Sequence, residues 1–452
     1  MTLHSALLLN QRNKRSNKAK ADLIAMWQHV DYLVIDEVSM IGCKLLLTIH
    51  EALCEAKENT KPFGGINIIF AGDFAQLPPV GDTRLYSHIN NKRAATQSGQ
   101  KDVFGKLLWL SIDKVILLHQ LVRQDPTSDF EFTELLGRLR TGSCSDKDYI
   151  FLNSKQLSNI PTNFENSLWT SAPILVSNND VKDALNLEAA QAFAARTNQQ
   201  LHSYYATDKR KDHIISDDEL KQKLLSYHSG KTDQRLGVLP LCKGMPVMLT
   251  HNYVVPDGIV NGTIGTLEKI NYTIDDMGRR HAHSCVIRTE NVMDNALPHL
   301  TSNEIVALEE ETTLTFTHPH SNKTCRFQRT QLPIVPAFAV TAHKSQGRTV
   351  CSAIVDIESC LTTEAVYVML SRVKTSNNIR ILRPFNKSKI CTRLSEDLRR
   401  EFKRLQYLNT QTRNPTRFDQ VPSVNASLGG SRDLEHVESW FDIAMASPKT
   451  PT

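Results

Sequence analysis

The sequence has 452 residues and a formal net charge of +5, and hydrophobic residues make up 40% of it. These values fit a globular protein of two to four domains, and the mild positive charge permits a nucleic-acid partner without requiring one. No run of about 18 apolar residues occurs, so we expect no membrane span. The nine cysteines are an odd number and form no CxxC pair, which favours reduced thiols over a disulfide framework.

The first part of the chain alternates short apolar runs with a helical pattern. Residues 32–35 and 66–70 are predicted to be strands, and residues 43–57 between them have apolar positions at helical spacing. The order strand, helix, strand indicates a parallel sheet with covered faces. Ligands of open α/β sheets bind at the carboxyl ends of the strands.

Acidic residues follow both predicted strands. Asp36 and Glu37 end the first strand within YLVIDEVSM, and Asp73 ends the second within AGDFAQLPPV, with Gln76 in the next turn. Nucleotide hydrolysis needs one carboxylate to hold Mg²⁺ and a second group to orient or deprotonate the attacking water. A glutamine can hydrogen bond with both a phosphate oxygen and a water. The structural alternatives are a helix cap at Asp36 or Ser39 and a turn stiffened by prolines.

The middle of the chain is predicted to be mainly helical. Residues 113–200 follow this pattern after one strand near Val115–Leu118. Residues 205–235 are polar and charged, which fits a flexible insertion or a surface helix.

A β-rich segment follows. Between about residues 236 and 335, β-branched and alternating runs bounded by turns predict a small barrel inserted in an α/β domain. Residues 336–385 return to strand and helix. From about residue 408 we expect a loosely ordered tail, except for a helix at Leu434–Ala446.

The motifs and their order resemble those of DNA helicases of the Pif-one (petite integration frequency) family, which are RecD-like proteins of superfamily one. IDEVSM and GDFAQLPPV resemble the Walker B motif and motif III of this family. The further matches are TLHS at 2–5, LHQLVRQ at 118–124 with FTELLGRLRTG, KGMPVMLTHN, NGTIG at 261–265, LPIVPAFAVTAHKSQGRTV at 332–350 and VYVMLSRV at 366–373. The resemblance covers roughly residues 1–385.

This resemblance implies an α/β fold of tandem RecA-like domains with a small inserted β-barrel. The first domain would be incomplete and would span residues 1–112. The second would comprise residues 113–250 and 332–400, and the barrel would comprise residues 251–331. Residues 408–452 would be the loosely ordered tail.

The resemblance also implies a site for ATP and Mg²⁺. Asp36 would bind Mg²⁺, Glu37 would activate water, Gln76 would sense the terminal phosphate, and Arg123 and Arg372 would act as arginine fingers. Arginine suits this role because its charged fork matches phosphate oxygens, although a lone arginine is more often part of a surface ion pair. The implied nucleotide-binding set is Asp36, Glu37, Asp73, Gln76, Arg123, Gly347 and Arg372.

Contacts with the DNA backbone are implied mainly by the TAHKSQG segment. Lys344 supplies charge, Thr341 and Ser345 supply hydroxyls, and glycine allows close backbone approach. The structural alternative is a strand-to-helix turn with Ser345 as a cap. The implied set is Thr2, His4, Asn261, Thr341, His343, Lys344 and Ser345. A zinc site at the alternating His281, His283 and Cys285, with His318, His320 and Cys325 further along, is the weaker alternative to a polar barrel face.

A phosphate-binding loop of the form GxxxxGK(S/T) is absent from the sequence. The nearest stretch, Gly99 to Leu107, has one residue too many between its glycines and a leucine in place of the metal-binding hydroxyl. It also follows motif III. Since the family's loop precedes TLHS, we expect the chain to begin after it and to hydrolyse ATP poorly or not at all by itself.

The favoured interpretation is an ATP-dependent DNA helicase that translocates 5′ to 3′ on single-stranded DNA. Its partners would be single-stranded and forked or structured DNA, in DNA repair, recombination or telomere maintenance. One alternative is a non-catalytic nucleic-acid-binding remnant derived from a mobile element. Another is a protein whose phosphate-binding loop comes from a partner chain. The resemblance points to the nucleus or the mitochondrion and to no membrane partner.

Overall fold

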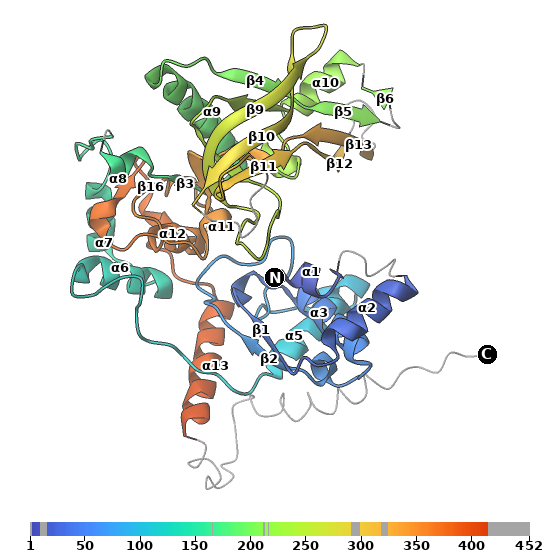
Figure 1. Ribbon diagram of the computed structural model, residues 1–452. Helices are drawn as coiled ribbons and strands as arrows, with labels where there is room; N and C mark the ends of the chain where they lie inside the picture. The colour runs from blue at the N-terminus through green and yellow to red at the C-terminus, as the bar shows by residue number, and fades with distance from the viewer. Residues whose placement is uncertain are drawn as a thin grey trace, which may run out of the picture. The chain divides into compact units, whose positions relative to one another are not determined.

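The computed structural model describes residues 2–9, 16–164, 166–210, 213–215, 217–290, 299–317 and 324–414. The chain divides into two compact units (Figure 1). Unit 1 contains the chain up to Leu121 and from Arg393 onward, and unit 2 contains Val122–Thr392. The helix expected at Leu434–Ala446 lies outside the described residues. None of the helices in the described ranges combines the length and the apolar character needed to cross a membrane.

Unit 1 is built on a pair of parallel strands joined by a helix. β1 (Tyr32–Ile35) pairs with β2 (Asn67–Phe70), and α3 (Cys43–Lys57) lies between them in the sequence. The apolar stripe of α3 is fully buried in the core of the unit, as its helical spacing predicts. The two strands and the helix predicted from the sequence are therefore confirmed.

One face of this sheet is exposed. Tyr32, Val34 and Ile69 are 65%, 62% and 50% exposed, whereas Leu33 and Ile35, which alternate with them, pack against the core. Successive side chains of a strand point to opposite faces, so the helices cover only one of the two. The expectation that both faces are covered is wrong for the described part of unit 1.

The remaining helices of unit 1 include one from the far end of the sequence. They are α1 (Leu3–Ala6), α2 (Asn17–Trp27), α4 (Asn91–Ala94), α5 (Gln97–Leu110) and α13 (Glu396–Arg413). Leu398, Phe402 and Leu405 place α13 on the core, and Trp109 Nε1 donates to Glu401 Oε1 at 2.9 Å. Residues 393–400 therefore belong to unit 1 and not to the second α/β domain, and the expected tail is helical as far as residue 413.

The strand expected near Val115–Leu118 is absent. Its amides instead donate to side chains of α13: Val115 N to Thr412 Oγ1 at 3.0 Å and Leu117 N to Asn409 Oδ1 at 2.9 Å. The partner of this segment is therefore the helix α13 and not a neighbouring strand. The prediction was wrong because its partner lies about 300 residues away in the sequence, where local periodicity gives no sign of it.

Unit 2 contains a four-stranded parallel sheet in the order β15, β3, β16, β17. These strands are Ala339–Thr341, Ile174–Val176, Ala353–Val355 and Ile379–Ile381. They are short, and most of their residues are buried, as is typical of parallel strands covered on both faces. The helices are α6 (Phe130–Thr141), α7 (Asp146–Ser154), α8 (Ser167–Thr170), α9 (Asn179–Arg196), α11 (Ala342–Ser345) and α12 (Thr363–Leu370).

A predominantly antiparallel β-region is inserted in unit 2, as predicted, but it is larger than expected. Its main path is β14 (Ile334–Pro336), β8 (Pro246–Leu249), β9 (Ile264–Ile274), β10 (Arg280–Thr289), β4 (His202–Tyr205) and β7 (Val238–Leu241), with β11 (Glu304–Leu308) on β10. A second sheet runs β12 (Glu310–Thr317), β13 (Thr324–Gln331), β5 (Thr207–Arg210), β6 (His213–Ile214), with α10 (Asp218–Leu225) in the segment expected to hold a surface helix. The expected limits of 251–331 are too narrow, because β4, β7 and β8 pair with later strands.

The packing of α13 yields a stability prediction. Leu398→Ala should lower the free energy of unfolding of unit 1 by about 2–5 kcal/mol, because the side chain is fully buried. Native-state hydrogen exchange of α5 and α13 amides measures the change. Arg400→Ala is the matched control on the same helix. Its exposed ion pair with Glu396 should contribute about 0.5 kcal/mol or less, and equal effects of the two variants would contradict the packing described.

Candidate functional site

The acidic residues of unit 1 lie at the carboxyl ends of the two paired strands. Asp36 follows β1 and is exposed, and Asp73 follows β2 and is half-buried. Two backbone hydrogen bonds hold these strand ends together: Ala71 N donates to Ile35 O at 2.8 Å, and Val38 N donates to Ala71 O at 2.9 Å. The structure thus brings together the acids that the sequence assigned to one site.

Glu37 adopts a left-handed backbone conformation, with φ 55° and ψ 46°. This conformation is rare for a residue with a side chain, and such strain concentrates at functional sites. The backbone of Gly72 packs against the same turn, since an added Cβ would lie 2.8 Å from Val38 N and 3.3 Å from Glu37 Cα. The adjacent Asp36 Oδ1 accepts from Glu37 N at 2.7 Å.

The helix-cap alternative for these residues is not what the structure shows. The short 3₁₀ turn after β1 (Val38–Met40) starts from Glu37 and has no side-chain cap hydrogen bond. Ser39 is buried, and its Oγ has no hydrogen-bond partner among the described residues. The turn is therefore shaped by backbone contacts, which leaves the carboxylate of Asp36 exposed beyond the strand end.

Gln76 lies in the turn that Asp73 organises. Asp73 Oδ1 accepts from Ala75 N at 3.1 Å, and Gln76 N donates to Asp73 O at 2.9 Å. The Oε1 atom of Gln76 is buried and has no hydrogen-bond partner within the described parts of the chain. An unsatisfied buried oxygen costs free energy, so it is suited to accept from a bound water or ligand donor.

The site fits Mg²⁺ and a nucleotide in part. Carboxylate oxygens such as those of Asp36 are the ligands that Mg²⁺ prefers, and the unsatisfied Gln76 Oε1 offers a place for a ligand donor. The stretch from Gly99 to Leu107 contributes no phosphate-binding loop, because it lies within α5. Gly105 packs there against the backbone of Cys43, where an added Cβ would come within 1.9 Å of the carbonyl oxygen.

In unit 2, the structure brings Arg123 and Arg372 together around Ser371. Arg123 Nε donates to Thr349 Oγ1 at 2.9 Å, and its NH1 donates to Ser371 O at 3.3 Å. Arg372 is only 2% exposed; its Nε donates to Val368 O at 2.7 Å and its NH2 to Ser371 Oγ at 2.8 Å. Both guanidinium groups are thus held within their own unit, and their role as arginine fingers stays a prediction.

The TAHKSQG segment forms the turn from β15 into α11. Thr341 and Ser345 are buried, and Ser345 Oγ donates to Ala342 O at 2.8 Å. The Ser345 hydroxyl therefore supports the turn from inside, in agreement with the structural alternative, although neither side chain caps the helix N-terminus. His343 is exposed and Lys344 half-buried, so these two side chains are the ones available to a ligand. Gly347 has φ 75°, the conformation that favours glycine.

The turn at NGTIG is docked on this segment. Lys344 Nζ lies 2.5 Å from Asn261 Oδ1, and Arg348 NH2 donates to Gly262 O. Asn261 and Lys344, two predicted DNA contacts that are 83 residues apart, are thereby brought together. Arg348 was not singled out from the sequence, because nothing in its local pattern distinguishes it from a surface arginine.

A buried lysine behind this turn was also missed. Lys182 is 1% exposed; its Nζ donates to Ser229 Oγ at 2.8 Å, to Gln234 Oε1 at 3.0 Å and to Asp183 Oδ1 at 3.1 Å. Burial, with the nearby charges of Arg348 and Lys182, lowers the pKa of Lys344, whereas Asp233 acts in the opposite direction. The site therefore holds an ammonium group that would be stabilised by an added anion.

Thr2 and His4, the first predicted DNA contacts, are exposed in unit 1. Thr2 is the N-cap of α1, where its Oγ1 accepts from Ser5 N at 3.3 Å. The structure thus gives Thr2 a local role and leaves the predicted contact of both residues with DNA open.

The zinc alternative has no support in the described residues. His281 Nε2 lies 3.1 Å from Asp275 Oδ2, His283 Nδ1 lies 2.9 Å from Glu309 Oε1, and Cys285 is fully buried. No cluster of three or more metal-binding side chains was found in the parts of the chain that the structure describes. His318 and His320 lie outside those parts.

Comparison with known proteins connects this geometry to one family. Residues 2–149 match the family described as PIF1-like helicase. The chain is 27% identical over 408 residues to the ATP-dependent DNA helicase PIF1 of Emericella nidulans, covering 83% of this chain and 49% of that protein. It is 25% identical to the ATP-dependent DNA helicase RRM3 of Saccharomyces cerevisiae, covering 86% of this chain and 56% of that protein. The chain spans about half the length of these curated relatives.

Solved structures show the same fold. The Pif1 helicase of Candida albicans superposes with a TM-score of 0.62 at 21% identity, over 90% of this chain and 85% of that chain. The Pif1 helicase from Bacteroides in complex with ADP-AlF3 and ssDNA gives a TM-score of 0.60 at 21% identity, over 90% and 83%. The α/β fold with an inserted β-region is therefore that of Pif1 helicases.

The close approach at Gly72 generates a prediction. Gly72→Ala should lower the free energy of unfolding of unit 1 by about 2–4 kcal/mol. The new Cβ would clash with the backbone of Val38, and the φ of this position is unfavourable for alanine. Gly81→Ala is the matched control: its φ is 71°, nothing lies within 4 Å of the added atom, and the change should cost about 1 kcal/mol. Equilibrium urea unfolding compares the two, and equal losses would contradict the contact with Val38.

Proposed function

Because residues 2–149 match the PIF1-like helicase family, we propose that the chain forms most of the motor of an ATP-dependent DNA helicase that moves along single-stranded DNA. The observation that carries the proposal is the placement of Asp36, Glu37 and Asp73 at the joined ends of β1 and β2, within the residues that match the family. The relatives are named ATP-dependent DNA helicases, which supports the same activity here.

Each acidic-site residue has a distinct role in the proposed hydrolysis. Asp36 would hold Mg²⁺, and the bound ion would supply positive charge to the phosphates. Glu37, fixed by its left-handed turn, accepts a proton from the attacking water, and Gln76 accepts a hydrogen bond from that water through its buried Oε1. By the family resemblance, Arg123 and Arg372 would supply positive charge to the terminal phosphate.

The proposal needs a phosphate-binding loop that this sequence does not contain. Without backbone N–H groups and a lysine around the phosphates, ATP is bound weakly and positioned poorly. We therefore expect the chain by itself to hydrolyse ATP poorly or not at all.

Single-stranded DNA would contact unit 2 at Lys344, Asn261 and His343. Lys344 is held next to Asn261, and its ammonium group lies near the cations Arg348 and Lys182. A phosphate placed there would compensate this concentration of positive charge. The Bacteroides Pif1 structures include complexes with ssDNA, which supports the same class of ligand.

The finer features of the proposal rest on the family resemblance. They are 5′ to 3′ translocation, action on forked or structured DNA in repair, recombination or telomere maintenance, and a nuclear or mitochondrial location. One solved Pif1 structure, with a TM-score of 0.58 to this chain, is described as the basis for DNA unwinding at forked dsDNA. A second candidate function is a non-catalytic nucleic-acid-binding protein, which the cations around Lys344 would also serve.

The ATPase assay separates these two functions. The chain alone should show no turnover above that of its Glu37→Gln variant, with or without single-stranded DNA. When the chain is extended to include a phosphate-binding loop, DNA should stimulate turnover, and Glu37→Gln should reduce it by at least about 100-fold. An extended chain that binds DNA but never hydrolyses ATP would favour the non-catalytic function. Turnover by the chain alone, abolished by Glu37→Gln, would show that no added loop is needed.

Lys344 provides a test of DNA binding. Lys344→Ala should weaken binding of a 20-nucleotide oligothymidylate by about 5- to 20-fold and reduce the slope of log affinity against log salt by about 1, because one phosphate contact is lost. Fluorescence anisotropy at several salt concentrations measures both quantities. Lys147→Ala, at an exposed lysine of α7, is the matched control and should change neither.

The lowered pKa of Lys344 predicts a pH dependence. In the free protein the ammonium group loses its proton at a lower pH than an ordinary lysine, and a bound phosphate restores the charged form. Binding therefore takes up a proton, so affinity should fall as the pH rises through the lowered pKa of Lys344 toward that of an ordinary lysine. Lys344→Arg stays charged throughout and should remove most of this dependence. Equal pH profiles for the two proteins would contradict the assignment.

A further inference from the structure

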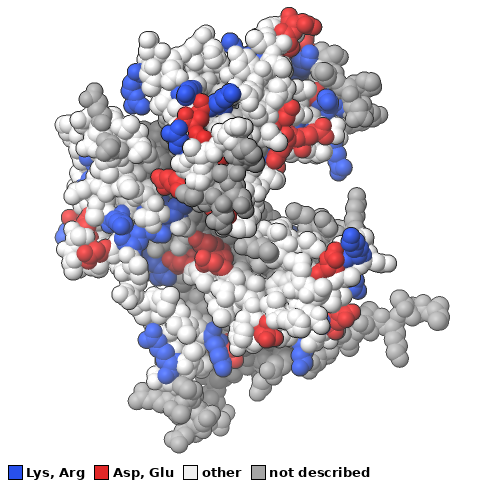
Figure 2. Space-filling view, viewed as in Figure 1, with Lys and Arg blue, Asp and Glu red and all other residues white. Residues whose placement is uncertain are grey.

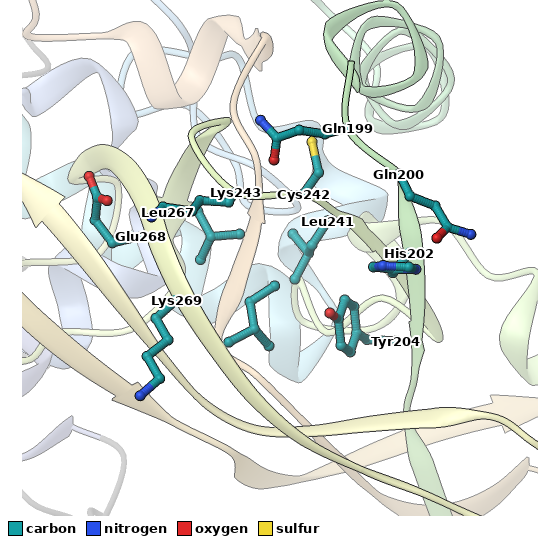
Figure 3. Close-up of a pocket in the computed structure, with 11 residues that line it drawn as sticks. Gln199, Gln200, His202, Tyr204, Leu241, Cys242, Lys243, Leu267, Glu268 and Lys269 are labelled. Carbon is teal, nitrogen blue, oxygen red and sulfur yellow. The ribbon is translucent and has the colours of Figure 1, made fainter. Parts of the chain in front are cut away.

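The β-region of unit 2 contains a pocket of about 360 Å³ that none of the functions above uses (Figure 3). It is formed by the turn between α9 and β4, by β4, by the end of β7 and the turn that follows it, and by β9. Its lining residues are Gln199, Gln200, His202, Tyr204, Leu241, Cys242, Lys243, Leu267, Glu268, Lys269 and Ile270. The volume lies within the range of about 300–1,000 Å³ typical of small-molecule sites.

Aromatic and apolar groups form the inside of the pocket. His202 and Tyr204 alternate along β4, so they point to the same face of the strand, and His202 lies opposite Leu241 in the register with β7. Figure 3 shows His202, Tyr204 and Leu241 gathered around the pocket, with Leu267 beside Leu241. Leu241 and Leu267 are fully buried, which gives the pocket a rigid apolar floor.

Polar and basic groups surround this floor. Gln199, Gln200, Lys243 and Lys269 are exposed, and Glu268 is half-buried. The rim therefore has two ammonium groups for one carboxylate, and Figure 3 shows Glu268 and Lys269 directed away from the centre. The two amides each offer a donor and an acceptor near the pocket.

The aromatic and basic character continues along the strands beyond the pocket. The rings of Tyr204 and Tyr272 meet edge to face, with 5.5 Å between their centroids. The guanidinium group of Arg280 lies 5.6 Å from the centroid of the Tyr272 ring, and Arg280 is paired in register with Tyr204. Basic and acidic side chains lie next to one another on the visible face of the molecule (Figure 2). The pocket itself combines aromatic walls with a rim of two lysines and one glutamate.

We propose that this pocket binds a nucleobase of a single-stranded nucleic acid, with the adjoining phosphates against Lys243 and Lys269. Aromatic rings and an apolar floor accept the flat face of a base, amides can hydrogen bond with its edge, and lysines follow the backbone. Burial and the nearby Arg280 lower the pKa of His202, which favours the uncharged ring for stacking. The proposal extends the proposed function by a contact that shares no residue with the site at Lys344.

The test compares three ligands with the full chain: a 20-nucleotide oligothymidylate, an abasic oligonucleotide of the same length, and thymidine monophosphate. His202→Ala and Gln200→Ala should each weaken binding of the oligothymidylate by about 3- to 10-fold and leave the abasic strand unaffected, because only a base can stack. Lys243→Glu should weaken both strands. Ser203→Ala is the matched control, since Ser203 is exposed on the opposite face of β4 and should change nothing.

The outcomes separate this inference from the proposed function. If Lys344→Ala weakens the oligothymidylate while His202→Ala and Gln200→Ala do not, the pocket assignment is wrong and the proposed function stands. If His202→Ala weakens the abasic strand equally, the contact is with the backbone and not with a base. If thymidine monophosphate binds in the pocket and the oligothymidylate does not, the ligand is a free nucleotide. If the unmodified chain binds no single strand at all, both proposals are overturned. Unfolding curves of each variant show whether a loss reflects misfolding.

Discussion

Parallel strand pairing is the constraint on which the ligand-facing parts of both units depend. In unit 1, the alignment of Ile35 with Phe70 brings the turns after β1 and β2 to the same edge, so the acids of two distant motifs meet. In unit 2, the pairing of β15 with β3 positions the turn that carries Lys344. The carboxyl ends of parallel strands lie at the same edge of the sheet, so several loops can contact one ligand there.

Sequence patterns correctly predicted the features that depend on neighbouring residues in the chain. The helix at Cys43–Lys57 and the acids after β1 and β2 follow from periodicity and from strand ends, and both were recognised in the sequence. The docking of α13 on unit 1 and the contact of Asn261 with Lys344 could not be predicted from spacing alone, because each joins segments far apart in the chain. For Asn261, the family resemblance supplied the signal that spacing lacked. Lys182 carried no signal at all, since a lysine in a helix is ordinarily exposed.

Buried polar groups fix the turns around these ligand-facing loops. Lys182 makes three hydrogen bonds or ion pairs behind the Lys344 turn, and Arg372 is buried against carbonyl groups of its own unit. Arg329 is fully buried and forms a bidentate ion pair with Asp208, which links β13 to β5. Removing one partner of such a network leaves a charge without compensation, so each network specifies one arrangement of its loops.

The exposed face of the β1–β2 sheet affects how the protein behaves at high concentration. Within the described residues the sheet has two strands, so both are edge strands, and Tyr32, Val34 and Ile69 present apolar side chains beside unpaired backbone groups. Such a surface is a template for another extended segment, whether that segment completes the sheet or belongs to an unrelated chain. Solubility and pairing with another segment thus depend on the same few side chains. A polar residue in place of Val34 would reduce aggregation of the chain, but it would also weaken the binding of any segment to that face.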